Sequence, residues 1–357
     1  MGRFCQSTTY GTDSGFLGHI LIMGLIINMG TVILTHADAD GICAGAISMS
    51  VYPKAKVFFT KPVSFLKDLE EAKGDKFIIS DIALNKRDAP DILKAMAEKG
   101  NITYLDHHPI PPNVRLEDIK EVCTYVHDEK ASASEIAYKY FEKEIPMERV
   151  WVAIYGGIAD YAADTEFIQG RMRNWDIRAL YFEVSTLVLG IKMEEFTSYD
   201  AKRNILQTLS RGGNPSDVFG LVNAAKVAVN VEFDLYNIVK ERAEKFNSIG
   251  YVYTIPSFGF RGPAALFAAT VTESPVGMCL NERKGYLDIT VRARELGIPL
   301  NKFMESAAEE VGGSGGGLED AAGGRIDPKN FRKFLEIMDK KIKGIKRIRQ
   351  PHPSPPV

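Results

Sequence analysis

The sequence contains little cysteine, and its cysteines stand far apart. No CxxC pair occurs among the four of them, which are Cys5, Cys43, Cys123 and Cys279. This spacing argues against a structural zinc site and against a disulfide scaffold. Isolated cysteines are typical of proteins in a reducing compartment, so we expect a cytoplasmic location.

The sequence also lacks a strong excess of charge. Its 44 basic and 46 acidic residues give a formal net charge of −2, which excludes an overall positive field that would attract nucleic acid. An anionic substrate would therefore need a local binding site. The composition is that of an ordinary globular protein, and 357 residues are enough for two domains with separate cores.

One long apolar run lies near the N-terminus, at residues 16–34, and has the length of a membrane-spanning helix. Its last residues belong to TVILTH, which has the pattern of a core strand, and only Arg3 supplies a basic residue before it. We therefore expect residues 1–28 to be an extension outside the core, with a membrane anchor or an additional packed helix as alternatives. No membrane contact is expected of the rest of the chain.

From residue 29 onward, short apolar runs alternate with stretches of helical periodicity. Strands are predicted at TVILTH, AKVFFT, KFIISD and NITYLDHH, with helices between them. This alternation predicts an α/β fold in residues 29–215, with a parallel sheet and helices on both of its faces. The part of this region after residue 148 is expected to be mostly helical.

The pattern changes after a predicted connecting helix in residues 216–248. The runs GYVYTIPS, AALFAATVTES and VGMCLNERKGYLDITVRAR are interpreted as short strands, and the glycine-rich segment GGSGGGLEDAAGG follows a helical stretch. We expect a smaller α+β domain in residues 249–342. The basic and proline-rich tail, residues 343–357, is interpreted as a solvated end, with a nucleic-acid-binding arm as the alternative.

Acidic and imidazole side chains follow the apolar runs of the first domain. These residues are His36, Asp38, Asp40, Asp81, Asp106, His107, His108 and Asp160. Because open parallel sheets bind ligands at the carboxyl ends of their strands, we expect the group to lie together. The pair Gly156–Gly157, just before Asp160, predicts close packing of that segment against the sheet.

Several carboxylates with imidazoles and no thiolate suit Mn²⁺ or Mg²⁺ better than Zn²⁺. Without cations these carboxylates would repel one another, whereas two divalent cations would neutralise them. Two metal ions also clamp the attacking and leaving oxygens of a displacement at phosphorus. The pattern therefore favours metal-dependent hydrolysis of phosphoesters. Caps, turns or a calcium-like loop at DADG are alternative roles for single members of the group.

The motifs HADADG, SD, LDHHP and GGIADY resemble, in order and context, the four motifs of the DHH phosphoesterases. That superfamily includes RecJ-like exonucleases and short-oligonucleotide phosphodiesterases. The segment EEVGGSGGGLEDAAGGRI is similar to the glycine-rich signature of the DHH-associated C-terminal domain. The resemblance covers most of the chain from Met29 to about Lys340, and it implies an active site in the cleft between two domains.

The resemblance implies a pair of metal ions, with manganese favoured and magnesium as the second choice. Asp38 and Asp40 would each hold one ion, and Asp81 would bridge the two. His107 and Asp160 would complete the coordination of the second ion.

The resemblance also implies roles for the other motif residues. His108 would face the substrate phosphate, and Asp106 would orient both histidines of its motif. Relatives carry a metal-ligating histidine four residues before the first motif aspartate, where this chain has Leu34. His36, two residues before that aspartate, is a candidate for the missing ligand.

In the second domain, the resemblance implies that the backbone N–H groups of Gly315, Gly316 and Gly317 hold a phosphate. Arg292 would bind the nucleotide through charge-assisted hydrogen bonds. Leu318 stands where relatives have a histidine, which affects how a terminal phosphate would be recognised. A flexible glycine linker, and a surface ion pair of Arg292 with Asp288 or Glu295, are the alternatives.

The predicted activity is that of a manganese-dependent phosphodiesterase or exonuclease that releases nucleoside monophosphates from short single-stranded RNA or DNA. A cyclic dinucleotide or a phosphoadenosine compound is the alternative substrate. A non-catalytic scaffold in a nucleic-acid complex is a third alternative, although such a protein would be expected to have lost metal ligands. The sequence is also compatible with a homo-oligomer.

Overall fold

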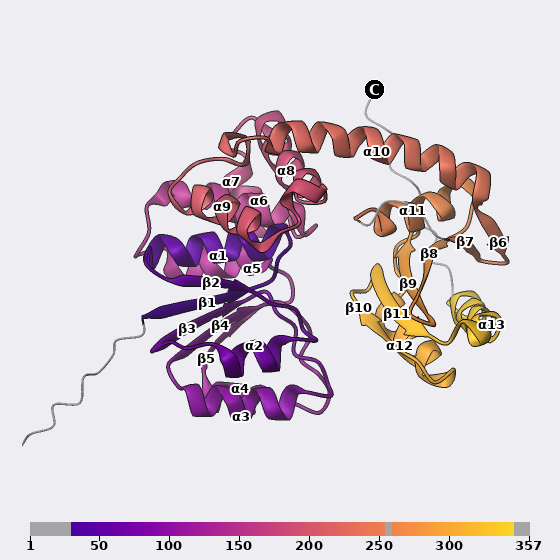
Figure 1. Ribbon diagram of the computed structural model, residues 1–357, viewed down its shortest axis with the longest axis horizontal. Helices are drawn as coiled ribbons and strands as arrows, with labels where there is room; N and C mark the ends of the chain where they lie inside the picture. The colour runs from indigo at the N-terminus through magenta and orange to yellow at the C-terminus, as the bar shows by residue number, and fades with distance from the viewer. Residues whose placement is uncertain (1–29, 254–258, 346–357) are drawn as a thin grey trace, which may run out of the picture.

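The computed structural model describes residues 30–253 and 259–345, and its N-terminal half is built on one parallel sheet (Figure 1). Its strands are β1 (Thr31–Thr35), β2 (Lys56–Phe59), β3 (Lys76–Ser80), β4 (Ile102–Asp106) and β5 (Thr124–His127). They are arranged in the order β2-β1-β3-β4-β5, and every neighbouring pair is parallel. The predicted parallel sheet is thus confirmed.

Helices cover both faces of this sheet (Figure 1). They are α1 (Ala39–Val51), α2 (Phe65–Glu71), α3 (Ala89–Lys99), α4 (Leu116–Val122) and α5 (Ala133–Phe141). Side chains of a strand point alternately to the two faces. Accordingly, Val32 and Leu34 of β1 pack in the core with α2 and α3, whereas Ile33 packs in the core with α1 and α5. This double burial explains why the strands are continuous apolar runs.

A layer of helices lies on the α1 and α5 side of the sheet. It comprises α6 (Val150–Ala159), α7 (Glu166–Met172), α8 (Ile177–Gly190) and α9 (Tyr199–Ser210), with the short 3₁₀ segments η1 (Met147–Arg149), η2 (Glu194–Phe196) and η3 (Pro215–Asp217). The predicted packing of Gly156–Gly157 against the sheet is wrong. A Cβ at Gly156 would lie 2.5 Å from the Asp40 side chain of α1, and one at Gly157 would lie 3.1 Å from Ile168 of α7. The apolar run forms a helix buried among other helices.

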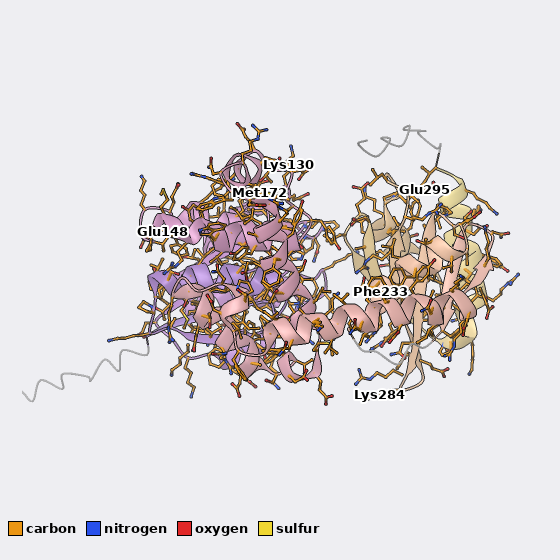
Figure 2. All side chains as sticks on the ribbon, turned by 90° about the horizontal axis from the view of Figure 1, so that it is seen from above. Lys130, Glu148, Met172, Phe233, Lys284 and Glu295 are labelled. Atoms are coloured by element: carbon orange, nitrogen blue, oxygen red, sulfur yellow. The ribbon has the colours of Figure 1, made fainter. Side chains whose placement is uncertain are left out.

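The long helix α10 (Leu221–Arg242) leads from this layer to a second sheet. In Figure 2, seen from above, Phe233 lies on the stretch of α10 between the two halves of the molecule, and 70% of its surface is exposed. The second sheet contains β6 (Glu244–Phe246), β7 (Ile249–Tyr253), β8 (Val276–Arg283), β9 (Tyr286–Ala293), β10 (Ser314–Gly317) and β11 (Ala321–Ile326). Its order is β10-β11-β9-β8-β7-β6, and of these pairs β7 and β8 are parallel while the rest are antiparallel.

The helices of the second half are α11 (Arg261–Val271), α12 (Leu300–Glu310) and α13 (Phe331–Lys343), with the 3₁₀ segment η4 (Pro328–Asn330). The interpretation of AALFAATVTES as a strand is wrong, because most of it forms α11. Small side chains line the buried face of this helix, namely Ala264, Ala265, Ala268 and Ala269. A Cβ at Gly277 of β8 would lie 1.8 Å from the Ala265 carbonyl oxygen. Alanine favours helix, and glycine in the sheet lets that helix approach closely.

The two halves touch beside α10. Leu189 of α8 and Met193 pack against the core formed by α10, α11, β7 and β8. The Lys192 ammonium lies 5.3 Å from the ring centroid of Phe260, just before α11. These contacts hold the start of the second half against the helical layer of the first.

The predictions for residues 1–28 and for most of the tail fall outside the described residues. Residues 31–34, which end the N-terminal apolar run, form part of β1 in the sheet. Within residues 30–253 and 259–345, no helix combines the length and the apolar character needed to cross a bilayer.

Candidate metal centre

The motif residues of the first domain gather at the carboxyl edge of the parallel sheet. Asp38 is the N-cap of α1, and its carboxylate accepts a hydrogen bond of 2.9 Å from the Gly41 N–H. Gly41 is required here, because a Cβ would lie 2.4 Å from the His36 carbonyl oxygen and 2.9 Å from Oδ2 of Asp81. The turn after β1 thus brings two motifs into contact.

Seven of the predicted residues offer ligand atoms in three overlapping groups. Within each group these atoms lie within 4.8 Å of one another. The groups are His36, Asp38 and Asp81; Asp40, His107 and Asp160; and Asp81, His107 and His108. Since Asp81 and His107 each belong to two groups, the three groups form one continuous cluster.

Asp81 occupies the centre of this cluster and is the residue that most requires a cation. Its side chain is 3% exposed, and Oδ2 has no hydrogen-bond partner among the described residues. Burial raises the pKa of Asp81 well above its usual value, and the charges of Asp38 and Asp40 add to the effect. A buried carboxylate without partners lowers the free energy of unfolding, and a bound cation would remove this penalty.

Asp40 is held by a helix that is distant in the sequence. Its two carboxylate oxygens accept hydrogen bonds from the backbone N–H groups of Ala133 and Ser134, at 2.7 and 3.1 Å. These groups belong to the first turn of α5, where the helix dipole favours a negative charge. The helix therefore fixes the orientation of Asp40 within its group.

The other members of that group face one another across the cluster. Nδ1 of His107 lies 3.5 Å from Oδ2 of Asp160, and Nε2 of His107 lies 3.3 Å from Oδ1 of Asp81. Asp160 is the C-cap of α6, in the region that the sequence predicts to be mostly helical. Burial, followed by the charges of Asp40 and Asp38, raises the pKa of Asp160 to about 8.

His36 lies at the opposite end of the cluster. Its Nδ1 atom is 2.7 Å from Oδ2 of Asp38 and 3.8 Å from Oδ2 of Asp81. Leu34, which stands where the resemblance implies a histidine, is fully buried in the core on the α2 and α3 side of the sheet. The geometry therefore makes His36 available as a ligand beside Asp38.

Asp106 orients one histidine of its motif. Its Oδ1 atom lies 2.9 Å from Nδ1 of His108, and Oδ2 lies 3.4 Å from the Tyr104 hydroxyl. Burial lowers the pKa of His108, but the hydrogen bond and the charge of Asp106 outweigh it and raise the value. His107 instead contacts Asp81 and Asp160, as described above.

Sequence reasoning missed several residues that support the cluster, among them Tyr104, His127 and Ser134. His127 ends β5 and donates a hydrogen bond of 2.8 Å from Nε2 to the His108 carbonyl oxygen. The segment TYVH alternates polar and apolar residues and ends in a histidine, as the motif LDHH does. This pattern could have indicated the fifth strand. The contact of Ser134 with Asp40 had no comparable signal.

The residues predicted in the second half lie outside this cluster. Gly315, Gly316 and Gly317 form β10, an edge strand paired with β11, rather than an open loop. Arg292 is half-buried in β9 and donates a hydrogen bond of 2.9 Å to the Val291 carbonyl oxygen. Arg292 does not form the alternative ion pair with Asp288, because Asp288 pairs with Arg325 at 2.6 Å.

Charged residues of the second half nevertheless lie within electrostatic range of the metal cluster. Burial lowers the pKa of Arg292, while Asp320 and the Tyr161 phenol raise it. Asp320 also contributes to the raised pKa of Asp160, after burial and closer charges. Arg292 and the turn between β10 and β11 therefore lie within electrostatic range of the residues that end α6.

Family models match both halves of the chain. The model described as DHH family, N-terminal domain, matches residues 30–160, and the DHHA1 domain model matches residues 263–344. Together they cover more than half of the sequence. The chain belongs to the DHH family of phosphoesterases. No curated protein matches it.

Solved structures share the fold of this DHH protein. A DHH domain described as a member of a family of ribosomal proteins has a TM-score of 0.69 and 15% identity, covering 90% of this chain and 88% of that one. RecJ from Thermus thermophilus in complex with Mn²⁺ has a TM-score of 0.63 and 16% identity over 90% of this chain. The DHH protein spans 53% of that RecJ, about half of its length.

A third similar structure is the pGpG-specific phosphodiesterase PggH of Vibrio. It has a TM-score of 0.52 and 14% identity, covering 88% of this chain and 99% of that one. At these low sequence identities, the structural similarity shows a common fold only. Family membership, together with the acidic cluster around Asp81, makes this DHH protein a metal-dependent phosphoester hydrolase that uses divalent cations.

Proposed function

We propose that the protein is a manganese-dependent phosphodiesterase that hydrolyses short single-stranded oligonucleotides to nucleoside monophosphates. The supporting observation is the carboxylate of Asp81, which is shared by two groups of ligand atoms and has one buried oxygen without a partner among the described residues. A pair of cations supplies charge neutralisation at phosphorus and a nucleophile at neutral pH. We place the enzyme in a reducing cytoplasm, as its isolated cysteines suggest.

The ligand atoms divide into two sets that would hold the two cations. His36 and Asp38 lie on one side of Asp81, and His107 and Asp160 lie on the other. Asp40 would belong to the second set, where the first turn of α5 fixes its carboxylate. Carboxylate and imidazole ligands without thiolate favour manganese, and magnesium is the second choice.

His108 would bind the scissile phosphate. Its hydrogen bond to Asp106 leaves Nε2 available, and 26% of its side chain is exposed, in contrast to the buried His107. Since Asp106 favours the protonated imidazole, His108 would donate a hydrogen bond to a non-bridging phosphate oxygen. Asp106 would keep the ring in that orientation.

The second half of the chain would bind the rest of the nucleotide. Arg292 is half-buried and lies within electrostatic range of the residues at the end of α6, so its guanidinium is suited to a phosphate held near Asp160. The edge strand β10 carries Gly315–Gly317, and its outer backbone N–H groups would supply further donors. The substrate would thus lie between the two halves.

The alternatives differ in substrate rather than in metal site. The similar structure described as a pGpG-specific phosphodiesterase favours a dinucleotide-sized substrate. Cyclic dinucleotides and phosphoadenosine compounds would use the same carboxylates and remain alternatives. A non-catalytic scaffold is disfavoured, because such a role gives no reason for Asp81 to stay buried without a partner.

A substrate panel tests the proposal. End-labelled RNA and DNA oligomers of two to ten residues, pGpG and a cyclic dinucleotide would be incubated with Mn²⁺ and, separately, with Mg²⁺. The proposal expects a ladder from one end and mononucleotide product from the short linear substrates, fastest with Mn²⁺. Absence of mononucleotide release from every linear oligomer with either ion would overturn it.

A further inference from the structure

Tyr161 directly follows Asp160, a member of the metal cluster, and has an unusual conformation. Its φ angle is 58°, in the left-handed region, and 93% of its surface is exposed. The Tyr161 N–H donates a hydrogen bond of 3.3 Å to the Ile158 carbonyl oxygen at the end of α6. Among the described non-glycine residues with positive φ, it is the only aromatic one.

Neither packing nor the backbone accounts for tyrosine at this position. The left-handed conformation is unfavourable for a side chain with a Cβ, and it favours glycine or asparagine. An exposed ring gains almost nothing from burial. A backbone outlier beside a catalytic cluster is an observation that calls for a functional explanation.

The surroundings of Tyr161 define what the ring could contact. Asp160, one residue before it, belongs to the group formed with Asp40 and His107. On the other side, the phenol lies within electrostatic range of Arg292 in the second half. The exposed ring is thus next in sequence to a member of the metal cluster and within electrostatic range of the cation that we assign to a substrate phosphate.

We propose that Tyr161 is a substrate-positioning residue whose ring stacks on the base of the terminal nucleotide. Resting on the proposed function, this inference narrows the substrate class to compounds that carry an accessible nucleobase, as opposed to polyphosphates or pyrophosphate. Stacking suits a non-specific enzyme, because every base has a face that an aromatic ring can cover. Arg292 would bind the phosphate of the same nucleotide.

The test combines enzyme variants with a base-free substrate. Wild type, Tyr161→Phe and Tyr161→Gly are assayed with Mn²⁺ on a dinucleotide and on the same compound with an abasic terminal residue. Glycine tolerates the left-handed conformation, so Tyr161→Gly removes the ring with no fall expected in Tm. The matched control is Phe219→Ala, because Phe219 is 98% exposed and belongs to none of the motifs in the sequence.

For the dinucleotide, Tyr161→Gly is expected to raise KM by about 5- to 150-fold, the range that corresponds to stacking on one base. Tyr161→Phe and Phe219→Ala are expected to behave as wild type. On the abasic compound, wild type and Tyr161→Gly should have the same raised KM, because the base and the ring form one interaction.

Two outcomes would overturn the inference, and they are distinguishable from failure of the proposed function. Equal losses for Tyr161→Gly on both substrates would mean that the ring does not contact the base. A Tyr161→Phe variant as impaired as Tyr161→Gly would assign the effect to the hydroxyl. If wild type releases nucleotide from neither compound nor any longer oligomer, the proposed function itself fails.

Discussion

Oδ1 of Asp81 lies 3.3 Å from Nε2 of His107, whereas Oδ2 of the same carboxylate is buried without a hydrogen-bond partner among the described residues. One carboxylate thus presents two oxygens in different directions. The φ angle of Asp81 is 59°, in the left-handed region, so the backbone is strained at the residue whose carboxylate is shared by two groups of ligand atoms. A substitution at Asp81 should therefore impair metal binding and, at the same time, stabilise the metal-free protein.

We expect Asp81→Asn to abolish activity while stabilising the metal-free protein. Loss of the shared carboxylate removes several kcal/mol of transition-state stabilisation, about a thousandfold or more in kcat. The amide carries no charge, so the repulsion among buried carboxylates is reduced. Activity assays and thermal unfolding in the presence of EDTA measure the two effects.

An exposed aspartate provides the control for this variant. Asp234 lies on the solvent side of α10, so Asp234→Asn should change neither kcat nor Tm. If Asp81→Asn kept more than a tenth of the wild-type kcat, Asp81 would not be a ligand shared by both cations.

His36→Ala tests whether this histidine replaces the ligand that Leu34 cannot provide. Because Nδ1 of His36 lies near Asp38 and Asp81 but belongs to only one group of ligand atoms, a single cation should be affected. We expect one of two Mn²⁺ equivalents to bind about 10- to 100-fold more weakly, as is typical when a metal site loses a supporting group. Calorimetric titration measures both affinities. Two unchanged sites would remove His36 from the ligand set.

Asp106→Asn tests whether Asp106 orients His108 without taking part in metal binding. The carboxylate touches His108 and the Tyr104 hydroxyl, and it belongs to none of the three groups of ligand atoms. We expect kcat to fall about 10- to 100-fold with both Mn²⁺ affinities unchanged. Loss of a Mn²⁺ equivalent in this variant would instead make Asp106 part of the metal site.

Much of the cluster could be predicted from the sequence because strand ends are a local signal. Apolar runs followed by Asp or His locate the ends of β1, β3 and β4, and parallel pairing then brings those ends together. Asp160 also lies in the cluster, at the end of α6, in the region that the sequence predicts to be mostly helical.

Other features depend on contacts that no local pattern carries. Asp40 is held by N–H groups 93 and 94 residues away, in the first turn of α5. The alanine-rich segment of α11 was interpreted as a strand, and its helix is stabilised by the glycines of the sheet beneath it. The glycines at 315–317 resemble a loop in the sequence, but pairing with β11 makes them a strand.

Gly156→Ala tests the close packing of α6 behind the metal cluster. A Cβ at Gly156 would lie 2.1 Å from the Ser134 Oγ and 2.5 Å from Oδ1 of Asp40. We expect a loss of about 1–3 kcal/mol in the free energy of unfolding from overpacking, together with weaker binding of one cation. Denaturant unfolding and Mn²⁺ titration measure these effects.

Gly170 of α7 provides a matched control, because a Cβ there would have no neighbour within 4 Å. Gly170→Ala in a helix interior should stabilise the protein by about 0.5–1 kcal/mol. If Gly156→Ala were equally stabilising, α6 would not pack as closely against Asp40 as the distances indicate.

The raised pKa of Asp160 predicts how the stability of the metal-free protein depends on pH. With a folded-state pKa of about 8 against an ordinary value near 4, the folded state keeps a proton that the unfolded state releases. Between about pH 4 and 8 the free energy of unfolding should therefore fall as pH rises, through this group. Cations bind the deprotonated carboxylate, so the Tm gained from Mn²⁺ should be larger at pH 8 than at pH 5.5.

Asp160→Asn isolates the contribution of this carboxyl group from those of the other titratable groups. The variant should show a flatter dependence of metal-free Tm on pH than wild type, and a smaller gain from Mn²⁺ at pH 8. Differential scanning fluorimetry with EDTA or Mn²⁺, from pH 5.5 to 8.0, measures both differences. Parallel curves for wild type and variant would mean that Asp160 is already ionised in the metal-free protein, because its charge would then cost no more in the folded state than in the unfolded one.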